Sequence, residues 1–162
     1  EKAINRRLWH KGHRFYDAYD LVAGELIEVD TASGFTPLYA GVPSSARAER
    51  LYEYLDSASF CPMHEKRCFS VPNYNIEGEH FDPRNYWRGP VWINMNWMLY
   101  HGLRAYGYAD KAESVKGDII ELIRRYGFHE YYDPLKGIGY GSKDFSWTAA
   151  LFLDIVYDEA AL

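Results

Sequence analysis

Residues Val91–Tyr106 read VWINMNWMLYHGLRAY, and the spacing of their apolar side chains is the strongest fold signal in the chain. Large apolar residues recur every three or four positions, at Trp92, Met95, Leu99, Leu103 and Tyr106. Such spacing places them on one face of an α-helix. Ile93 and Met98 lie on other faces and leave little polar surface. The pattern predicts a helix over 91–106 that is buried on nearly all sides.

The following helix is predicted to lie outside the buried one. Asp110, with Glu113 three residues later, resembles a capping box that begins this helix. An apolar stripe then leads to Gly127 and consists of Val115, Ile119, Leu122 and Tyr126. The opposite face is charged and carries Lys111, Lys116, Glu121, Arg124 and Arg125. We therefore expect the charged face to meet solvent.

A third, mostly apolar helix is expected at about 146–157. Buried and solvent-facing helices that alternate across short turns are typical of an antiparallel array of helical hairpins. The predicted fold class is therefore mainly α, with residues 1–162 forming a single region.

The N-terminal part is predicted to be more varied. Residues 1–9 read as the middle of a helix without a preceding cap, so an N-terminally incomplete chain is expected. Residues 13–21 and 26–30 predict a small β-hairpin across a turn that contains Gly24. Helices are expected at 33–41, with Pro37 near the first turn, and from about 43 to 55. Residues 57–88 lack periodicity, and we expect an ordered functional loop there.

Composition narrows the range of partners. The chain has 23 acidic and 18 basic residues and no basic run that could follow a phosphate backbone, so nucleic acid is not expected as a partner. No apolar run is long enough for a membrane span; the location stays open, with the cytoplasm favoured. Fifteen Tyr and five Trp residues suit carbohydrate, because their rings stack on sugar faces and their polar atoms form hydrogen bonds.

Neither a metal nor a cofactor is predicted. Cys61 and Cys68 flank His64, but no second ligand pair follows at zinc-site spacing. Free thiols are favoured over the alternatives, a disulfide and a metal site. His10 and His13 are read as surface residues because no third ligand is evident. Residues 137–143 are glycine-rich, but their spacing is wrong for a phosphate-binding loop.

Two segments concentrate the residues that suit a sugar-binding site. The first, 85–94, reads NYWRGPVWIN and combines aromatic rings, a guanidinium and amides. The second, 128–134, reads FHEYYDP and places Glu130 among aromatic residues; DFSWTAAL follows at 144–151. Glu130 is expected in a loop at a helix end, with His129 and Tyr131 available to orient it.

These motifs resemble the C-terminal region of glycoside hydrolase family 63, in their order and in their spacing. That family includes processing α-glucosidases and hydrolases of mannosylglycerate and glucosylglycerate. Residues 15–17 (FYD) and 34–38 (GFTPL) fit the same family, so the resemblance covers nearly the whole chain.

The resemblance implies part of an (α/α)6 toroid, built from six helical hairpins, and an inverting mechanism with two carboxyl groups. Glu130 matches the general base. The general acid of the family is an earlier Asp that this chain does not contain; Asp17, Asp20 and Asp82 do not match it. The chain is therefore expected to be catalytically incomplete alone. The resemblance assigns substrate contacts to Tyr86, Trp87, Arg88, Trp92, Tyr131, Asp144 and Trp147, and Trp92 has helix anchoring as its alternative.

Two other functions stay open from the residues alone. One is a carbohydrate-binding module that uses the aromatic groove without cleavage, and the other is a helical interaction protein. A partial toroid would leave apolar hairpin faces uncovered. Self-association, or the missing N-terminal half, is expected to cover them.

Overall fold

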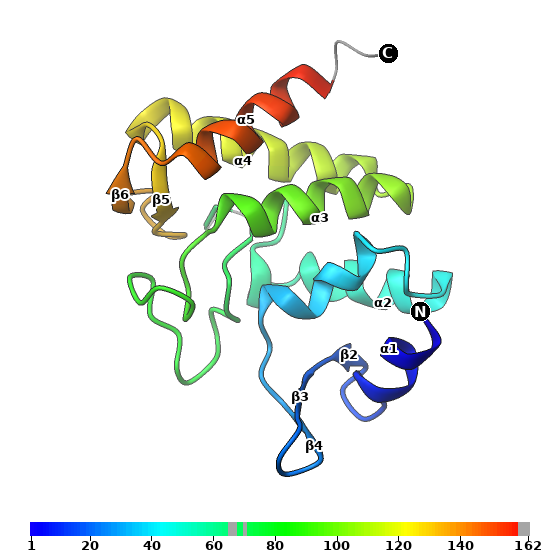
Figure 1. Cartoon of the computed structure of the whole chain (residues 1–162). Coiled ribbons are helices and arrows are strands. Elements are labelled where there is room, and N and C mark those ends of the chain that lie inside the picture. The colour runs from blue at the N-terminus through cyan, green and yellow to red at the C-terminus, as the bar shows by residue number, and fades with distance from the viewer. Residues whose placement is uncertain (65–67, 70, 159–162) are drawn as a thin grey trace.

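Three long helices form the upper part of the molecule in Figure 1. The computed structural model describes residues 1–64, 68–69 and 71–158. Helix α3 (Ile93–Ala105) packs against both α4 (Ala109–Tyr126) and α5 (Ser146–Tyr157). On the other side of α3 lie α2 (Ser45–Leu55) and the 3-10 segment η1 (Ala32–Leu38) (Figure 1). The described residues are thus mainly helical, as predicted, and α3 is the central element.

The burial of α3 confirms its prediction from sequence. Its buried residues are Ile93, Met95, Asn96, Leu99, Tyr100, Gly102 and Leu103. A Cβ on Gly102 would lie 2.7 Å from the backbone nitrogen of Tyr39, so only glycine lets α3 approach the end of η1 this closely. The helix begins at Ile93 rather than Val91, because Val91 pairs with other backbone segments instead.

Helix α4 differs from its prediction in two ways. It begins at Ala109, and Asp110 lies inside the first turn without a side-chain cap bond, so the predicted capping box is wrong. Lys111 and Lys116, expected in solvent, are both buried. Lys111 is tolerated there because its Nζ donates to Asp56 Oδ1 and to the carbonyl oxygen of Cys61, both at 2.8 Å.

Small antiparallel hairpins surround the helices. After the short helix α1 (Lys2–Arg7), β1 (Trp9–His10) pairs with β2 (Phe15–Tyr16), and β3 (Ala18–Asp20) pairs with β4 (Glu25–Ile27). The β3–β4 pair is the hairpin that the sequence predicted. A third hairpin, β5 (His129–Tyr132) with β6 (Gly139–Lys143), was not predicted. The expected helix at 33–41 is instead the 3-10 segment η1, and a second short one, η2 (Ala58–Phe60), follows α2.

The loop after η2 contains a disulfide between Cys61 and Cys68, so the expectation of free thiols was wrong. The two Cα atoms lie 5.7 Å apart, within the range that a disulfide spans. Disulfides are rare in reducing compartments such as the cytoplasm. The disulfide therefore does not favour the predicted cytoplasmic location, which stays a prediction. None of the described helices is long and apolar enough to span a membrane.

Candidate active site

Glu130 lies on strand β5, not in the loop that was expected. His129 pairs with Lys143 and Tyr131 with Tyr140, so Gly141 and Ser142 together oppose the single residue Glu130. This is a β-bulge, a feature that changes the direction of side chains and is frequent beside active sites. The bulge explains how a carboxylate on a strand can face the neighbouring loop.

Both oxygens of the Glu130 carboxylate accept a hydrogen bond. The Tyr86 hydroxyl donates to Oε1 at 3.2 Å, and the backbone N–H of Ser142 donates to Oε2 at 3.1 Å. Gly141 has a φ of +70°, and a Cβ there would lie 2.6 Å from Glu130 Oε2. Glycine is therefore required at this position of the bulge, both by its backbone angle and by the space that Glu130 fills.

The aromatic residues predicted for the site form one cluster beside Glu130. Trp87 stacks on Trp92 with ring centroids 4.1 Å apart, and Trp92 stacks on Tyr131 at 5.2 Å. The Tyr86 ring stands nearly perpendicular to all three. Trp92 is only 2% exposed, whereas Trp87 is 43% exposed. Trp92 is thus the buried member of the stack and Trp87 the more exposed one; substrate contact by either ring stays a prediction.

A main-chain bridge holds the two sequence motifs together. Val91 and Tyr132 exchange backbone hydrogen bonds of 2.8 and 3.0 Å, which joins the segment before α3 to β5. The Tyr132 hydroxyl donates to the carbonyl oxygen of Gly127 at 2.7 Å, and burial raises the pKa of Tyr132 to about 12. This buried residue fixes the strand that carries Glu130.

Further hydrogen bonds shape the segment that carries Tyr86 and Trp87. Trp92 Nε1 donates to the carbonyl oxygen of Tyr86 at 2.7 Å, and Asn73 Nδ2 donates to that of Trp87 at 2.8 Å. Tyr86 has a φ of +29°, an unfavourable angle for a side chain of its size. These bonds hold it there, and such strain is concentrated at functional sites.

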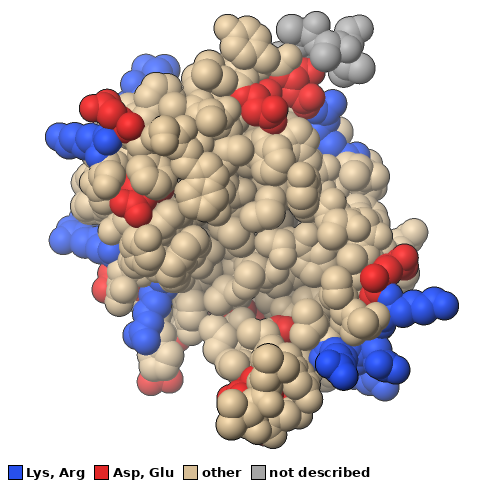
Figure 2. Space-filling model, viewed as in Figure 1, with Lys and Arg blue, Asp and Glu red and all other residues tan. Residues whose placement is uncertain are grey.

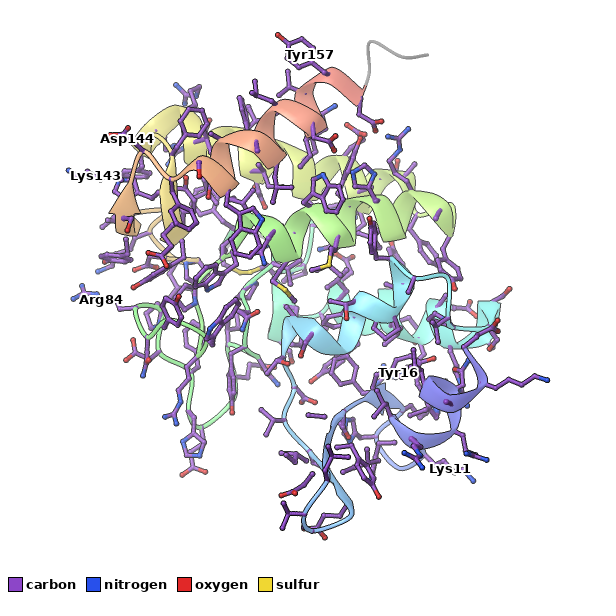
Figure 3. All side chains as sticks on the ribbon, viewed as in Figure 1. Lys11, Tyr16, Arg84, Lys143, Asp144 and Tyr157 are labelled. Carbon is purple, nitrogen blue, oxygen red and sulfur yellow. A yellow bond between two sulfur atoms is a disulfide. The ribbon has the colours of Figure 1, made fainter. Side chains whose placement is uncertain are left out.

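The remaining predicted residues lie outside this cluster. Arg88 is exposed and forms no ion pair within 1–64, 68–69 and 71–158. Asp144, at the end of β6, is also exposed, with a φ of +52°. Figure 3 shows it on the same side of the molecule as Arg84 in the loop. Trp147, at the start of α5, is 48% exposed. Their contacts with a substrate stay predictions.

The residues that orient Glu130 differ from those named by sequence reasoning. His129 packs against Tyr132, and a Cβ on Gly139 would collide with its ring, so it does not turn toward the carboxylate. Ser142, Gly141 and Asn73 were missed. Ser142 acts through its backbone N–H and Gly141 through its lack of a side chain, and sequence motifs display neither property. The glycine-rich run at 137–143 was the signal in the sequence that could have indicated them.

The hydrogen bond between Tyr86 and Glu130 leads to a measurable pKa effect. Loss of hydration and the bond to the Glu130 carboxylate raise the pKa of Tyr86 above its ordinary value. Removing the negative charge favours the phenolate, so Glu130→Gln should lower this pKa. NMR titration of the Tyr86 ring carbon measures it, with Glu121→Gln as the control that leaves it unchanged. An unaltered Tyr86 pKa in Glu130→Gln would show that the two groups do not interact.

The chain is similar to known glycoside hydrolases. The model of the mannosylglycerate hydrolase MGH1-like glycoside hydrolase domain matches residues 1–148. The mannosylglycerate hydrolase of Rubrobacter radiotolerans is 45% identical over 157 residues, which are 97% of this chain and 35% of that protein. The enzyme of the same name from Thermus thermophilus is 47% identical over 146 residues, which are 90% of this chain and 34% of that protein.

A solved structure shares the fold at a similar level of identity. The family 63 mannosylglycerate hydrolase from a second strain of Thermus thermophilus, in complex with glucose, superposes with a TM-score of 0.83 and 46% identity. The match covers 91% of this chain and 36% of that one. The chain thus spans about a third of the length of these relatives. By the matched domain model and these relatives, the chain belongs to the MGH1-like glycoside hydrolases of glycoside hydrolase family 63.

Proposed function

We propose that this chain forms the C-terminal part of an (α/α)6 inverting α-glycosidase, in which Glu130 is the general base. The observation that carries the proposal is the Glu130 carboxylate held by the Tyr86 hydroxyl and the Ser142 N–H beside exposed aromatic rings. The substrate class is an α-glucoside or α-mannoside, and glycerate conjugates are the first candidates, because related proteins carry the name mannosylglycerate hydrolase.

The base must remove a proton from a water molecule while that water attacks the anomeric carbon. The two donors occupy one position on each Glu130 oxygen and leave other lone pairs available for that water. They also fix the direction of the carboxylate, which matters because small displacements of a catalytic group cost much of the rate. The exposed Trp87 ring and the polar groups of Arg88, Asp144 and Trp147 would contact the substrate.

The general acid of this mechanism is proposed to lie outside these 162 residues. Asp17 is buried beside β2, and Asp20 accepts hydrogen bonds from the backbone of its own turn, at Val22 and Ala23. Asp82 accepts one from the backbone N–H of Arg84. The burial of Asp17 and the backbone hydrogen bonds of Asp20 and Asp82 support the expectation that none of the three donates a proton to a leaving group.

The direct test is monosaccharide release from α-glucosides, α-mannosides and their glycerate conjugates, with the chain and its Glu130→Gln variant side by side. Neither protein should hydrolyse them, since a base without its acid partner lacks leaving-group protonation. Efficient hydrolysis that is lost in Glu130→Gln would contradict the missing acid and confirm the base. If the chain binds these glycosides without cleaving them, and Glu130→Gln binds them with the same affinity, the carbohydrate-binding module would be favoured.

Arg88 is proposed to bind the carboxylate of a glycerate aglycone, because its guanidinium is exposed and offers two parallel donors. Arg88→Lys keeps the charge but loses the fork, so affinity for mannosylglycerate should fall by about tenfold, as expected for one weakened charge-assisted hydrogen bond. Isothermal titration calorimetry measures the effect, and affinity for a methyl glycoside should not change. Equal affinity of both proteins for mannosylglycerate would contradict the contact.

The outer face of α5 is proposed to be covered in the working protein, by a second copy or by the remaining hairpins. Its exposed apolar residues are Trp147, Leu153, Val156 and Tyr157. In Figure 2, viewed as in Figure 1, most charged side chains lie near the edge of the molecule, and other residues cover most of its centre. We expect the isolated chain to self-associate, as measured by light scattering, and Leu153→Glu to reduce it. A monodisperse monomer at high concentration would contradict this prediction.

A further inference from the structure

Three side chains from separate segments meet around His13, far along the chain from Glu130. His13 lies in the turn between β1 and β2, Asp17 follows β2, and Asp30 follows β4. His13 Nε2 lies 3.3 Å from Asp17 Oδ1 and 3.5 Å from Asp30 Oδ1. His13 was expected on the surface, but its side chain is only 30% exposed. The fold therefore brings two carboxylates to His13 that sequence spacing did not reveal.

The Asp17 carboxylate lacks the partners that a buried charge requires. The residue is 3% exposed, and neither carboxylate oxygen accepts a hydrogen bond within the described part of the chain. His13 Nε2 is likewise buried without a hydrogen bond. A buried carboxylate is costly unless it is paired and hydrogen-bonded or coordinates a metal. The pair thus points to a positive charge between these atoms, either a proton on His13 or a bound cation.

Asp30 is oriented as metal-ligating carboxylates are. Its Oδ2 accepts hydrogen bonds from the Tyr54 hydroxyl at 2.6 Å and from Asn75 Nδ2 at 3.4 Å. Its Oδ1 is left to face His13. Hydrogen bonds of this kind fix the direction of a ligand and support the metal site from outside.

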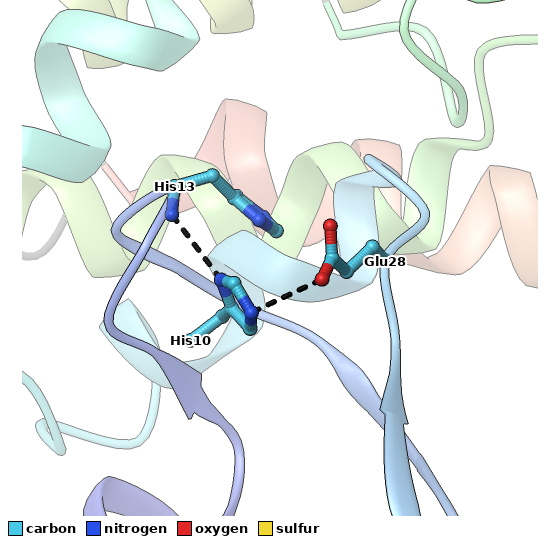
Figure 4. Close-up of side chains that lie close together, drawn as sticks. All are labelled: His10, His13 and Glu28. Carbon is cyan, nitrogen blue, oxygen red and sulfur yellow. Dashed lines mark hydrogen bonds and ion pairs between the residues drawn. The ribbon is translucent and has the colours of Figure 1, made fainter.

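A neighbouring group, His10 with His13 and Glu28, is less suited to hold an ion. Figure 4 shows that both ring nitrogens of His10 are already engaged. His10 Nδ1 accepts from the backbone N–H of His13 at 3.2 Å, and His10 Nε2 lies 3.1 Å from Glu28 Oε1. The His10 ring stacks on the His13 ring, with centroids 4.7 Å apart. This stacking restricts the rotation of the His13 ring.

We propose that His13 Nε2, Asp17 and Asp30 bind a divalent transition-metal ion of the zinc class, with water at the remaining position. Ligand atoms about 2.1 Å from a tetrahedral ion stand roughly 3.4 Å apart, which matches the two distances from His13. Imidazole and carboxylate donors suit this class of metal. Two carboxylates and a neutral imidazole carry two negative charges, which one divalent ion balances. The ion would join the β1–β2 turn to the segment that follows β4.

The test is a calorimetric titration of the chain with zinc chloride, after treatment with a chelator and its removal. One equivalent should bind, and His13→Gln and Asp17→Asn should each weaken binding by at least about 100-fold, while Tyr54→Phe weakens it by about tenfold. His80→Gln is the matched control, because His80 is exposed and outside the cluster. Circular dichroism establishes whether each variant is folded. If Asp17→Asn does not fold, zinc binding by His13→Gln decides the test.

The absence of stoichiometric zinc binding by the wild-type chain would overturn the proposal. Binding that persists in folded His13→Gln, or that His80→Gln removes equally, would also overturn it, because the ion would then lie elsewhere on the surface. A rise in the unfolding temperature with zinc for the wild type, absent in His13→Gln, is expected as an independent readout.

Discussion

Asp56→Ala should lower the free energy of unfolding by about 3–5 kcal/mol, as expected when one member of a buried ion pair is removed. Lys111 is fully buried on α4, and its Nζ has Asp56 Oδ1 and the Cys61 carbonyl oxygen as partners. Without Asp56 the ammonium group keeps one neutral acceptor and loses the carboxylate that it contacts. Urea unfolding measures the change, and Arg124→Ala, which breaks an exposed pair with Glu121, should cost no more than about 1 kcal/mol.

The same pair has a predictable pH dependence. Burial lowers the pKa of Lys111 in the folded chain, although the bond to Asp56 raises it in part. At pH values between the folded and the unfolded pKa of Lys111, the unfolded state binds more protons than the folded state. The free energy of unfolding therefore rises with pH across that interval. Removing Asp56 lowers the folded pKa further and should extend the rise to lower pH. Equal pH profiles for wild type and Asp56→Ala would contradict a buried, charged Lys111.

Gly141→Ala should displace Glu130 and destabilise the β5–β6 hairpin. The new Cβ would lie 2.6 Å from Glu130 Oε2 and 2.7 Å from Glu130 Cβ, and the backbone would keep a φ of +70° that alanine disfavours. The positive φ alone costs roughly 1–2 kcal/mol, and the collision adds to it. We expect the Ser142 amide resonance to shift in NMR spectra, because its hydrogen bond to Glu130 is lost.

Gly107→Ala is the matched control for this change. Gly107 has a φ of +85°, but a Cβ there meets nothing within 4 Å. Its alanine variant should therefore show the cost of the backbone angle without the collision. The excess loss of stability in Gly141→Ala isolates the contact with Glu130. Equal losses, with the Ser142 amide unshifted, would mean that the bulge does not constrain the carboxylate.

Helical periodicity predicted the larger elements well. The stripe around Leu99 predicted α3, and α5 has the bounds expected from its apolar run. Lys111 was misplaced because periodicity assigns a lysine to solvent, whereas its burial depends on Asp56 and on a carbonyl oxygen of a distant loop. The pairing of Cys61 with Cys68 likewise depends on how that loop turns, which periodicity does not describe.

The site was predictable where side chains carry the signal. The motifs named Tyr86, Trp87 and Tyr131 as candidates, and the structure places them in contact around Trp92, while their contacts with a substrate stay predictions. The support of Glu130 was not predictable, because it depends on a bulge and on the N–H of Ser142. The cluster around His13 was not predicted for a related reason: its residues come from separate segments brought together by two hairpins.

A chimeric enzyme tests the role of Glu130 most directly. In it, this chain replaces the matching third of the Thermus thermophilus mannosylglycerate hydrolase, and hydrolysis of mannosylglycerate is measured with Glu130 and with Gln in its place. We expect an active chimera whose kcat falls by about 10²–10⁴-fold in Glu130→Gln, the usual contribution of a general base, while Glu121→Gln has no effect. A folded Glu130→Gln chimera that hydrolyses mannosylglycerate as fast as its parent would contradict the assignment.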